Sequence, residues 1–147
     1  MRINLKTAAL LALSISCSAV SAQDIDPSAL VKAAQATIQQ IDTGNSAAVW
    51  EGMSGVVKQR IPRKDFTEAT LRARQPLGTP GTRYWVAISR QELAKATASI
   101  PAGMYTSVEF ETLFQGNKAV RELISFRLDE DKTWRASGYT VRANEAR

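Results

Sequence analysis

The chain has 147 residues, of which 44% are hydrophobic and 22% charged, a composition typical of a folded protein rather than a disordered one. This length predicts one domain with a sizeable core. Histidine is absent and Cys17 is the only cysteine. The sequence therefore excludes a Ser-His-Asp triad, a Cys-His dyad, a histidine-containing metal site and an intrachain disulfide.

The first 22 residues have the layout of a secretory signal peptide. Arg2 and Lys6 give a positive start, residues 8–15 form an apolar run, and Val20-Ser21-Ala22 supplies the small residues that signal peptidase reads. We therefore predict a signal peptide over residues 1–22, one domain over residues 23–147 and a periplasmic location. The apolar run is shorter than the roughly twenty residues that a membrane span needs, so we expect no transmembrane segment in the mature chain.

Processing as a lipoprotein at Cys17 is the alternative. It requires a leucine-like residue three positions before the cysteine, where this chain has Ser14. We therefore favour cleavage after Ala22. The formal charge would then fall from +5 to +3, because Arg2 and Lys6 leave and no acidic residue does. The remaining basic residues are dispersed, and so we predict no nucleic-acid partner.

Apolar residues recur at three- and four-residue spacing in the first half of the mature chain, which predicts helices. Asp26-Pro27 is a typical helix start, because aspartate accepts bonds from free amides and proline is pre-set for the first turn. Ile61-Pro62 separates the second helix from the third, since a residue before proline avoids helical angles. The first predicted helix ends near residues 43–44, and the third begins near residues 63–66 and runs toward Pro76. The second begins after residues 45–46 with an apolar stripe that reaches Val57, but Gly52 and Gly55 weaken it.

Beyond Pro80-Gly81 the period of the pattern falls to two, which predicts strands. In the first strand Tyr84, Val86 and Ile88 are expected to share one face. Turns are predicted at 101–103, 116–117 and 129–132, between strands at 84–93, 108–114, 120–128 and 134–141. Helices followed by an antiparallel meander predict an α+β fold whose curved sheet packs one face on the helices.

The segment from about residue 42 to residue 142 resembles the bacterial family catalogued as domain of unknown function 4019. The pieces that carry the resemblance are Asp42-x-Gly44, Trp50-Glu51, Arg74-x-Pro76-Leu77-Gly78, Pro101-x-Gly103-x-Tyr105, Phe110-Glu111-x-x-Phe114, Glu122 and Trp134-Arg135-x-Ser137-Gly138-Tyr139. The chain departs from the pattern at Asn45-Ser46, where an aromatic residue is expected, and in its acidic hairpin, which lacks a glycine. The resemblance implies a small exported domain with a cone like the nuclear-transport-factor-2 (NTF2) or cystatin-like folds, and it implies no particular activity.

Glu122 is the most informative position, because strand alternation places it on the core side with Val120, Ile124 and Phe126. A buried carboxylate needs a partner. One interpretation is structural, with Glu122 bonded to Tyr139, a tryptophan N–H or an arginine. Another makes Glu122 the polar group of a ligand pocket. A third is a register slip or bulge that turns Glu122 outward. The candidate ligand-binding residues are Glu122, Tyr139, Trp85 and Arg74.

Glu109 and Glu111 share one strand face, opposite Arg121, Ser125 and Arg127 on the next strand. Cross-strand charge pairing on a solvated face explains them better than acid–base chemistry. Two carboxylates without a third ligand make a poor metal site. We therefore assign no catalytic residue, metal or cofactor.

These observations favour a non-enzymatic exported domain that binds a protein partner or a small ligand. Two alternatives stay open. One is an acid–base enzyme that works without histidine, using a pocket glutamate with Tyr139 as donor. The other is an inhibitor or immunity protein for an envelope enzyme, which would present the acidic loop of residues 129–131. A pocket containing Glu122 would favour ligand binding or catalysis, whereas a filled cone with a bare apolar patch on the sheet would favour a protein partner.

Overall fold

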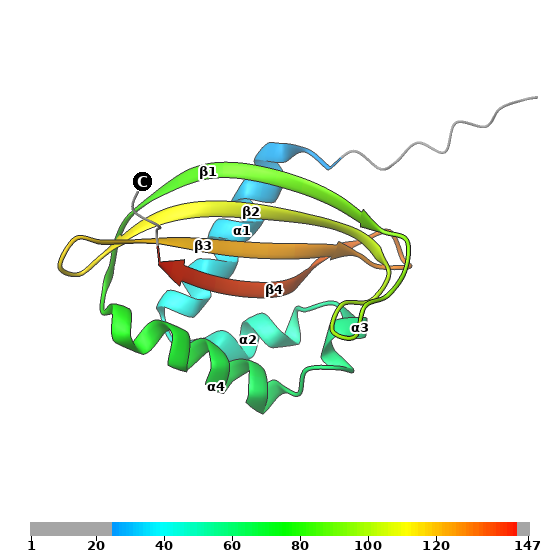
Figure 1. The fold of residues 1–147 in the computed structure, drawn as a ribbon, viewed down its shortest axis with the longest axis horizontal. Coiled ribbons are helices and arrows are strands. Elements are labelled where there is room, and N and C mark those ends of the chain that lie inside the picture. The colour runs from blue at the N-terminus through cyan, green and yellow to red at the C-terminus, as the bar shows by residue number, and fades with distance from the viewer. Residues whose placement is uncertain (1–24, 144–147) are drawn as a thin grey trace, which may run out of the picture.

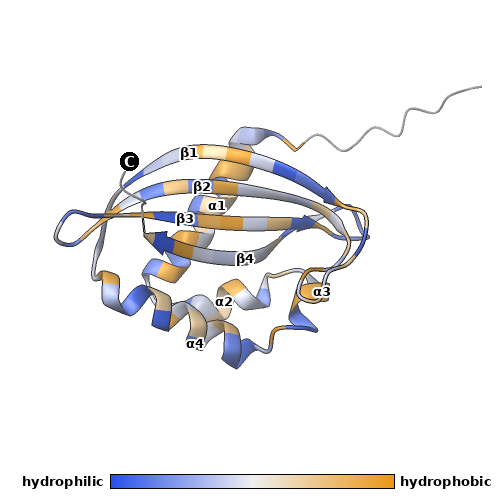
Figure 2. Ribbon diagram, in the orientation of Figure 1, coloured by the Kyte–Doolittle hydropathy of each residue, from blue (hydrophilic) through white to orange (hydrophobic). Residues whose placement is uncertain are grey.

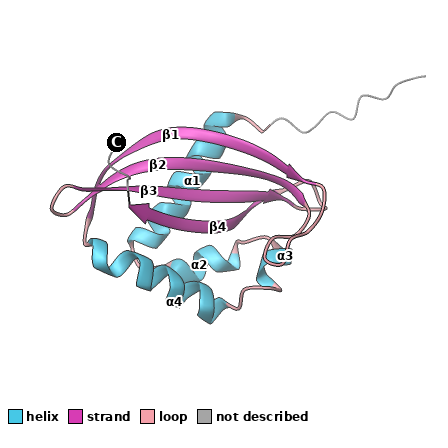
Figure 3. Cartoon of the chain, in the orientation of Figure 1, coloured by secondary structure: helices cyan, strands magenta, loops and turns pink. Residues whose placement is uncertain are grey.

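The structure, a computed structural model, describes residues 25–143, so the predicted signal peptide and Cys17 lie outside the described residues. Within this range four α-helices and a short 3₁₀ turn precede a four-stranded antiparallel sheet (Figures 1 and 3). The elements are α1 (Pro27–Asp42), α2 (Ser46–Glu51), α3 (Gly55–Lys58), α4 (Arg63–Arg74), η1 (Gln75–Leu77), β1 (Pro80–Leu93), β2 (Gly103–Phe114), β3 (Lys118–Leu128) and β4 (Trp134–Ala143). The predicted α+β class is confirmed. No helix among these residues has both the length and the apolarity to cross a membrane.

The helices begin and end where local chemistry dictates. At the start of α1 the side chain of Asp26 accepts a hydrogen bond from the backbone N–H of Ser28, with Pro27 in the first turn, as predicted. The single helix predicted over residues 46–57 is instead two short helices, α2 and α3. The helix α2 ends at Glu51, directly before Gly52, because glycine is a poor helix former.

The strands follow one another in space as β1-β2-β3-β4, as predicted for a meander. The hairpin between β2 and β3 turns at Gly116 and Asn117, which both have positive φ angles of 77° and 57°. Glycine and asparagine tolerate this region better than other residues do, which explains their place in the turn. The sheet curves over the helices, and α1 crosses its concave face (Figure 1).

The alternation predicted for β1 is wrong at one point. The pairing of β1 with β2 shifts between Trp85 and Ala87, so Val86 is the extra residue of a β-bulge. As a result Trp85 and Ile88 pair with Phe110 and Val108 on the inner face, whereas Tyr84 pairs with Glu111 on the outer face and does not share a face with Ile88. A bulge of one residue is invisible to a pattern of period two.

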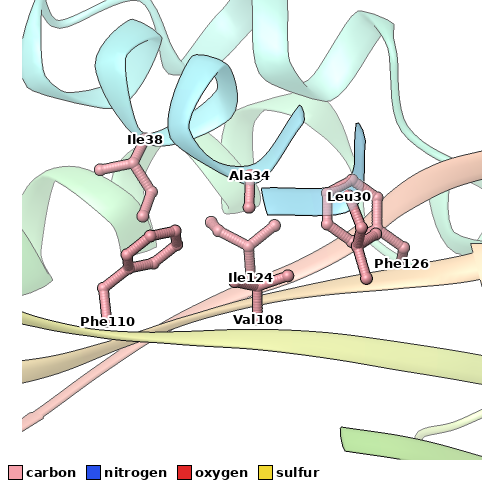
Figure 4. Packing of buried hydrophobic residues seen from close by; sticks show 7 residues of the cluster. All are labelled: Leu30, Ala34, Ile38, Val108, Phe110, Ile124 and Phe126. Carbon is pink, nitrogen blue, oxygen red and sulfur yellow. The ribbon is translucent and has the colours of Figure 1, made fainter. Parts of the chain in front are cut away.

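The core lies between α1 and the inner face of β2 and β3 (Figure 4). Side chains of α1 interleave with those of the two strands, and the fully buried members include Ile38, Phe110 and Ile124. A second cluster joins α2, α3 and α4 through Val49, Met53, Val57 and Phe66. Tyr139 of β4 packs against both clusters, so the helical layer and the sheet share one continuous interior.

Candidate functional site

Two arginines and two carboxylates form a closed square at one end of the core. Arg74 ends α4 and Arg83 lies near the start of β1, while Asp42 ends α1 and Glu122 lies in the middle of β3. Each arginine bonds both carboxylates: Arg74 bonds Asp42, and its Nη1 lies 2.5 Å from Oε1 of Glu122. Arg83 lies 3.1 Å from Oδ2 of Asp42 and 3.0 Å from Oε2 of Glu122. The four charges cancel within the square.

The Glu122 carboxylate has no exposed surface, and its oxygens are fully used. Oε1 accepts from Arg74 and from the Tyr139 hydroxyl at 2.6 Å, while Oε2 accepts from Arg83 and from the hydroxyl of Thr112. A carboxylate offers about four lone-pair sites, so four donors leave no acceptor free for a substrate. This arrangement is a saturated structural network.

The network joins elements that are distant in sequence. Its residues come from the last residues of α1 and α4 and from all four strands, and the guanidinium of Arg74 also lies over the ring of Phe114 at 4.6 Å. The inner-face register of the sheet brings these groups together, because Arg83 pairs with Thr112 and Glu122 pairs with Phe110 and Val141. The square therefore fixes how the helices sit on the sheet.

Burial and the neighbouring charges shift the pKa values of Tyr139 and Arg83 in this network. Burial, together with the adjacent Glu122 carboxylate, raises the pKa of the Tyr139 hydroxyl far above its usual range, so the hydroxyl keeps its proton. Burial lowers the pKa of Arg83, but the carboxylates of Asp42 and Glu122 outweigh it and the net shift is upward. Tyr139 is consequently a donor in this network and not an available base.

Three of the four candidate residues from the sequence meet here: Glu122, Tyr139 and Arg74. The fourth, Trp85, lies elsewhere, on the β1 edge of the sheet, with 56% of its surface exposed. Sequence reasoning missed Asp42, Arg83 and Thr112. Of these three residues only Asp42 belongs to a motif that the sequence shows. The positions of Arg83 and Thr112 depend on the pairing register of β1 with β2, which the sequence pattern does not give.

Tyr139→Phe tests the network with a minimal change. Removing the hydroxyl deletes one bond to a buried carboxylate, and we expect the free energy of unfolding to fall by about 1.5–3 kcal/mol in urea denaturation. The matched control is Tyr84→Phe, since the Tyr84 side chain is exposed and its loss of a hydroxyl should change stability by less than about 0.5 kcal/mol. Equal effects of the two substitutions would contradict the structural role.

A second charge cluster surrounds Asp129 at the opposite end of β3. The buried Asp129 carboxylate accepts from the Ser54 hydroxyl at 2.5 Å, from Arg127 at 2.9 Å and from Arg135 at 3.1 Å. Burial raises the pKa of Asp129, but these three bonds outweigh it and hold the pKa below its usual range. The other acidic residues of the loop also form ion pairs. Glu130 pairs with Arg127 at 3.0 Å, and Asp131 pairs with Arg135 at 2.8 Å.

Glu109 and Glu111 lie on the outer face of the sheet, as predicted. Arg121 approaches Glu109 at 3.8 Å and Glu111 at 3.4 Å, and Arg142 approaches Glu109 at 3.3 Å. Such half-exposed pairs contribute little to stability. Among residues 25–143 no group of three or more acidic residues or cysteines is placed to hold a metal ion.

Two open grooves lie near the network, and one of them borders it through Arg74. One of about 590 Å³ runs between α4 and the corner joining α1 to α2; Leu71 and Arg74 line it, but Glu122 and Tyr139 do not. Another, of about 340 Å³, lies between the N-terminal half of α1 and Trp85 of β1. The buried carboxylate thus opens into neither groove.

The fold and the two charge clusters define a small α+β domain whose buried ionic groups are structural. The chain belongs to the family described as "Protein of unknown function (DUF4019)", whose model matches residues 33–139. The resemblance stated from the sequence is thereby confirmed. A comparison with curated proteins finds no match.

Proposed function

We propose that this domain is a non-enzymatic binding module that recruits a protein partner through the outer edge of β1. The observation that carries the proposal is a run of three consecutive exposed side chains at that edge, Tyr84, Trp85 and Val86, which are 54%, 56% and 43% exposed. Tyr84 lies on the outer face of the sheet and Trp85 on the inner face, so the exposed groups surround the edge from both sides. Large apolar and aromatic groups that cluster at one place mark interaction sites, whereas scattered ones do not. Figure 2 shows the hydrophobic colouring in the middle of β1.

Backbone geometry supports the same surface. β1 is an end strand of the sheet, and among the described residues it pairs with β2 alone, so one side of a 14-residue strand is available for pairing. An extended segment of a partner can add to such an edge by main-chain hydrogen bonds, with side-chain pockets giving specificity. The groove between α1 and Trp85 lies beside this edge and supplies such a pocket.

The saturated square of Asp42, Arg74, Arg83 and Glu122 gives less support to an acid–base enzyme. A general base must accept a proton from its substrate, and Glu122 has its acceptor sites filled by protein donors. The inhibitor or immunity alternative also gains little, since arginines neutralise the acids of the 129–131 loop.

We further propose that the protein acts outside the cytoplasm, in the periplasm, and that the sheet and helices form an NTF2-like or cystatin-like cone. The signal-peptide pattern of residues 1–22 supports the first proposal. The curvature of the sheet over α1 and the filled interior between them support the second.

The test compares capture of envelope proteins by the wild-type domain, by Trp85→Lys and by Leu71→Lys. Leu71 is the matched control, since it is also an exposed apolar residue, 62% exposed, but lies on α4. We expect mass spectrometry to show partners that Trp85→Lys loses and Leu71→Lys keeps, with unfolding free energies of both variants within about 0.5 kcal/mol of wild type. Capture that both variants retain, or a small molecule that co-purifies without protein, would overturn the proposal.

A further inference from the structure

We infer that the partner which the β1 edge fits is a second copy of this chain, paired antiparallel about a twofold axis at Ile88. The inference rests on the proposed function, since it names the occupant of the same edge. Two four-stranded sheets would join at their β1 strands into one continuous sheet. Such a contact is isologous, which means that both copies use the same strand. If one residue of the first copy faces a given residue of the second, the reverse pair also forms.

The β1 edge has some of the devices that keep sheet edges from pairing, but it keeps one long regular stretch. Folded proteins protect edges with lysines, prolines, bulges or a covering helix. The sequence of β1 holds no lysine, and its proline is its first residue. Its pairing with β2 is irregular between Pro80 and Arg83 and at Val86, but the seven residues 87–93, which include Arg90 and Glu92, are in regular register. The opposite edge strand, β4, contacts α4 and has an irregular register beside Gly138. With 14 residues against 10, β1 is the longer of the two edge strands.

The faces of the strand set the register. Beyond the bulge, Ala87 and Ser89 pair with Glu109 and Ser107 on the outer face, and Ile88 pairs with Val108 on the inner face. An antiparallel copy must place inner residues opposite inner residues, because side chains alternate strictly between faces. Centring the axis on Ile88 satisfies this rule, since Ala87 then lies opposite Ser89 of the second copy.

The same register pairs complementary side chains across the bulge. With Val86 left out of the ladder, Trp85 lies opposite Arg90 of the second copy, and both positions belong to the inner face, beside Phe110 and Thr106. A guanidinium over an indole is a favourable cation–π pair, and twofold symmetry makes it twice.

The helix α1 provides support beneath the added strand. Its N-terminal half and Trp85 enclose the groove of about 340 Å³, which is lined by Pro27, Ser28, Val31, Lys32, Gln35 and Trp85. The N-terminal end of α1 is drawn beyond β1 in Figure 1, past the edge of the four-stranded sheet. The inner face of a strand added at β1 would therefore lie over this groove, with Arg90 of the second copy directed toward Trp85.

The first experiment measures association by sedimentation equilibrium. We expect a particle of twice the chain mass, and we expect Trp85→Lys to weaken the dimer roughly tenfold or more, because a like charge then faces Arg90. Leu71→Lys should leave the dimer unchanged. The double variant Trp85→Lys with Arg90→Glu should restore it, since opposite charges again meet across the axis. A monomer at every concentration, or a double variant weaker than Trp85→Lys alone, would overturn the inference.

The second experiment reads the register directly. In a Cys17→Ser background, Ala87→Cys and Ser89→Cys introduce single thiols at exposed positions of the outer face. Mixing the two variants should give disulfide-linked heterodimers in excess over either homodimer. Equal or no cross-linking of the mixture would exclude this pairing. If the chain is monomeric but Trp85→Lys still loses an envelope partner, the self-pairing fails and the proposed function stands.

Discussion

Replacing Glu122 by glutamine is expected to lower the free energy of unfolding by about 3–5 kcal/mol. The substitution keeps the shape of the side chain but leaves Arg74 and Arg83 with Asp42 as the one remaining carboxylate of the square. Breaking a buried ion pair is costly, because the surviving charge stays in the interior without compensation. Urea denaturation followed by tryptophan fluorescence measures the loss.

Two further variants make this result specific. Glu109→Gln removes a carboxylate from the outer face of the sheet, where its ion pairs are partly exposed, and should cost less than about 1 kcal/mol. Combining Glu122→Gln with Arg83→Gln should cost less than the two single changes together, since the pair then leaves no net charge behind. A loss for Glu122→Gln no larger than that for Glu109→Gln would show that the square is not structural.

Replacing Asp129 by asparagine is expected to cost about 2–3 kcal/mol at neutral pH, because its carboxylate accepts three bonds, one of them from the buried Arg127. The folded-state pKa of Asp129 is depressed, so the unfolded chain takes up the proton first as the pH falls. This contribution is therefore complete above about pH 4 and is lost progressively below it.

The check is the free energy of unfolding measured between about pH 2 and pH 7 for both proteins. The difference between wild type and Asp129→Asn should shrink as the pH falls, because protonation removes in the wild type the same charge that the substitution removes. Asp131→Asn is the control within the loop: Asp131 is exposed and should cost clearly less at neutral pH. A difference that stays constant down to pH 2 would mean that the Asp129 charge does not stabilise the fold.

Sequence patterns predicted much of the fold for local reasons. The Asp26-Pro27 start of α1, the turn at Gly116-Asn117 and the change of period near Pro80 each depend on the conformational preferences of a few adjacent residues. Placing Glu122 on the core side needed only the alternation of one strand. A buried carboxylate requires donors, and of the three alternatives considered, Tyr139, a tryptophan N–H or an arginine, the structure shows Tyr139 and arginines bonded to Glu122.

The rest depended on relations between strands. The bulge at Val86 turns Trp85 onto the inner face, and no period-two pattern reveals a single inserted residue. The place of β1 at the end of the sheet leaves the Trp85 side chain exposed and outside the network. Asp42 and Arg83 are separated from Glu122 by long stretches of chain, and only the β1–β2–β3 register and the position of the α1 end bring them together.

By itself the sequence determined the order of helices and strands, the inward face of β3 and the absence of histidine chemistry, because these follow from residue types and short-range spacing. The tertiary structure alone decided that Glu122 is saturated by two arginines, a tyrosine and a threonine, and that Trp85 lies at an open edge. The physical reason is that charge neutralisation and edge exposure depend on strand register and helix docking, which are set by the packing of the whole chain.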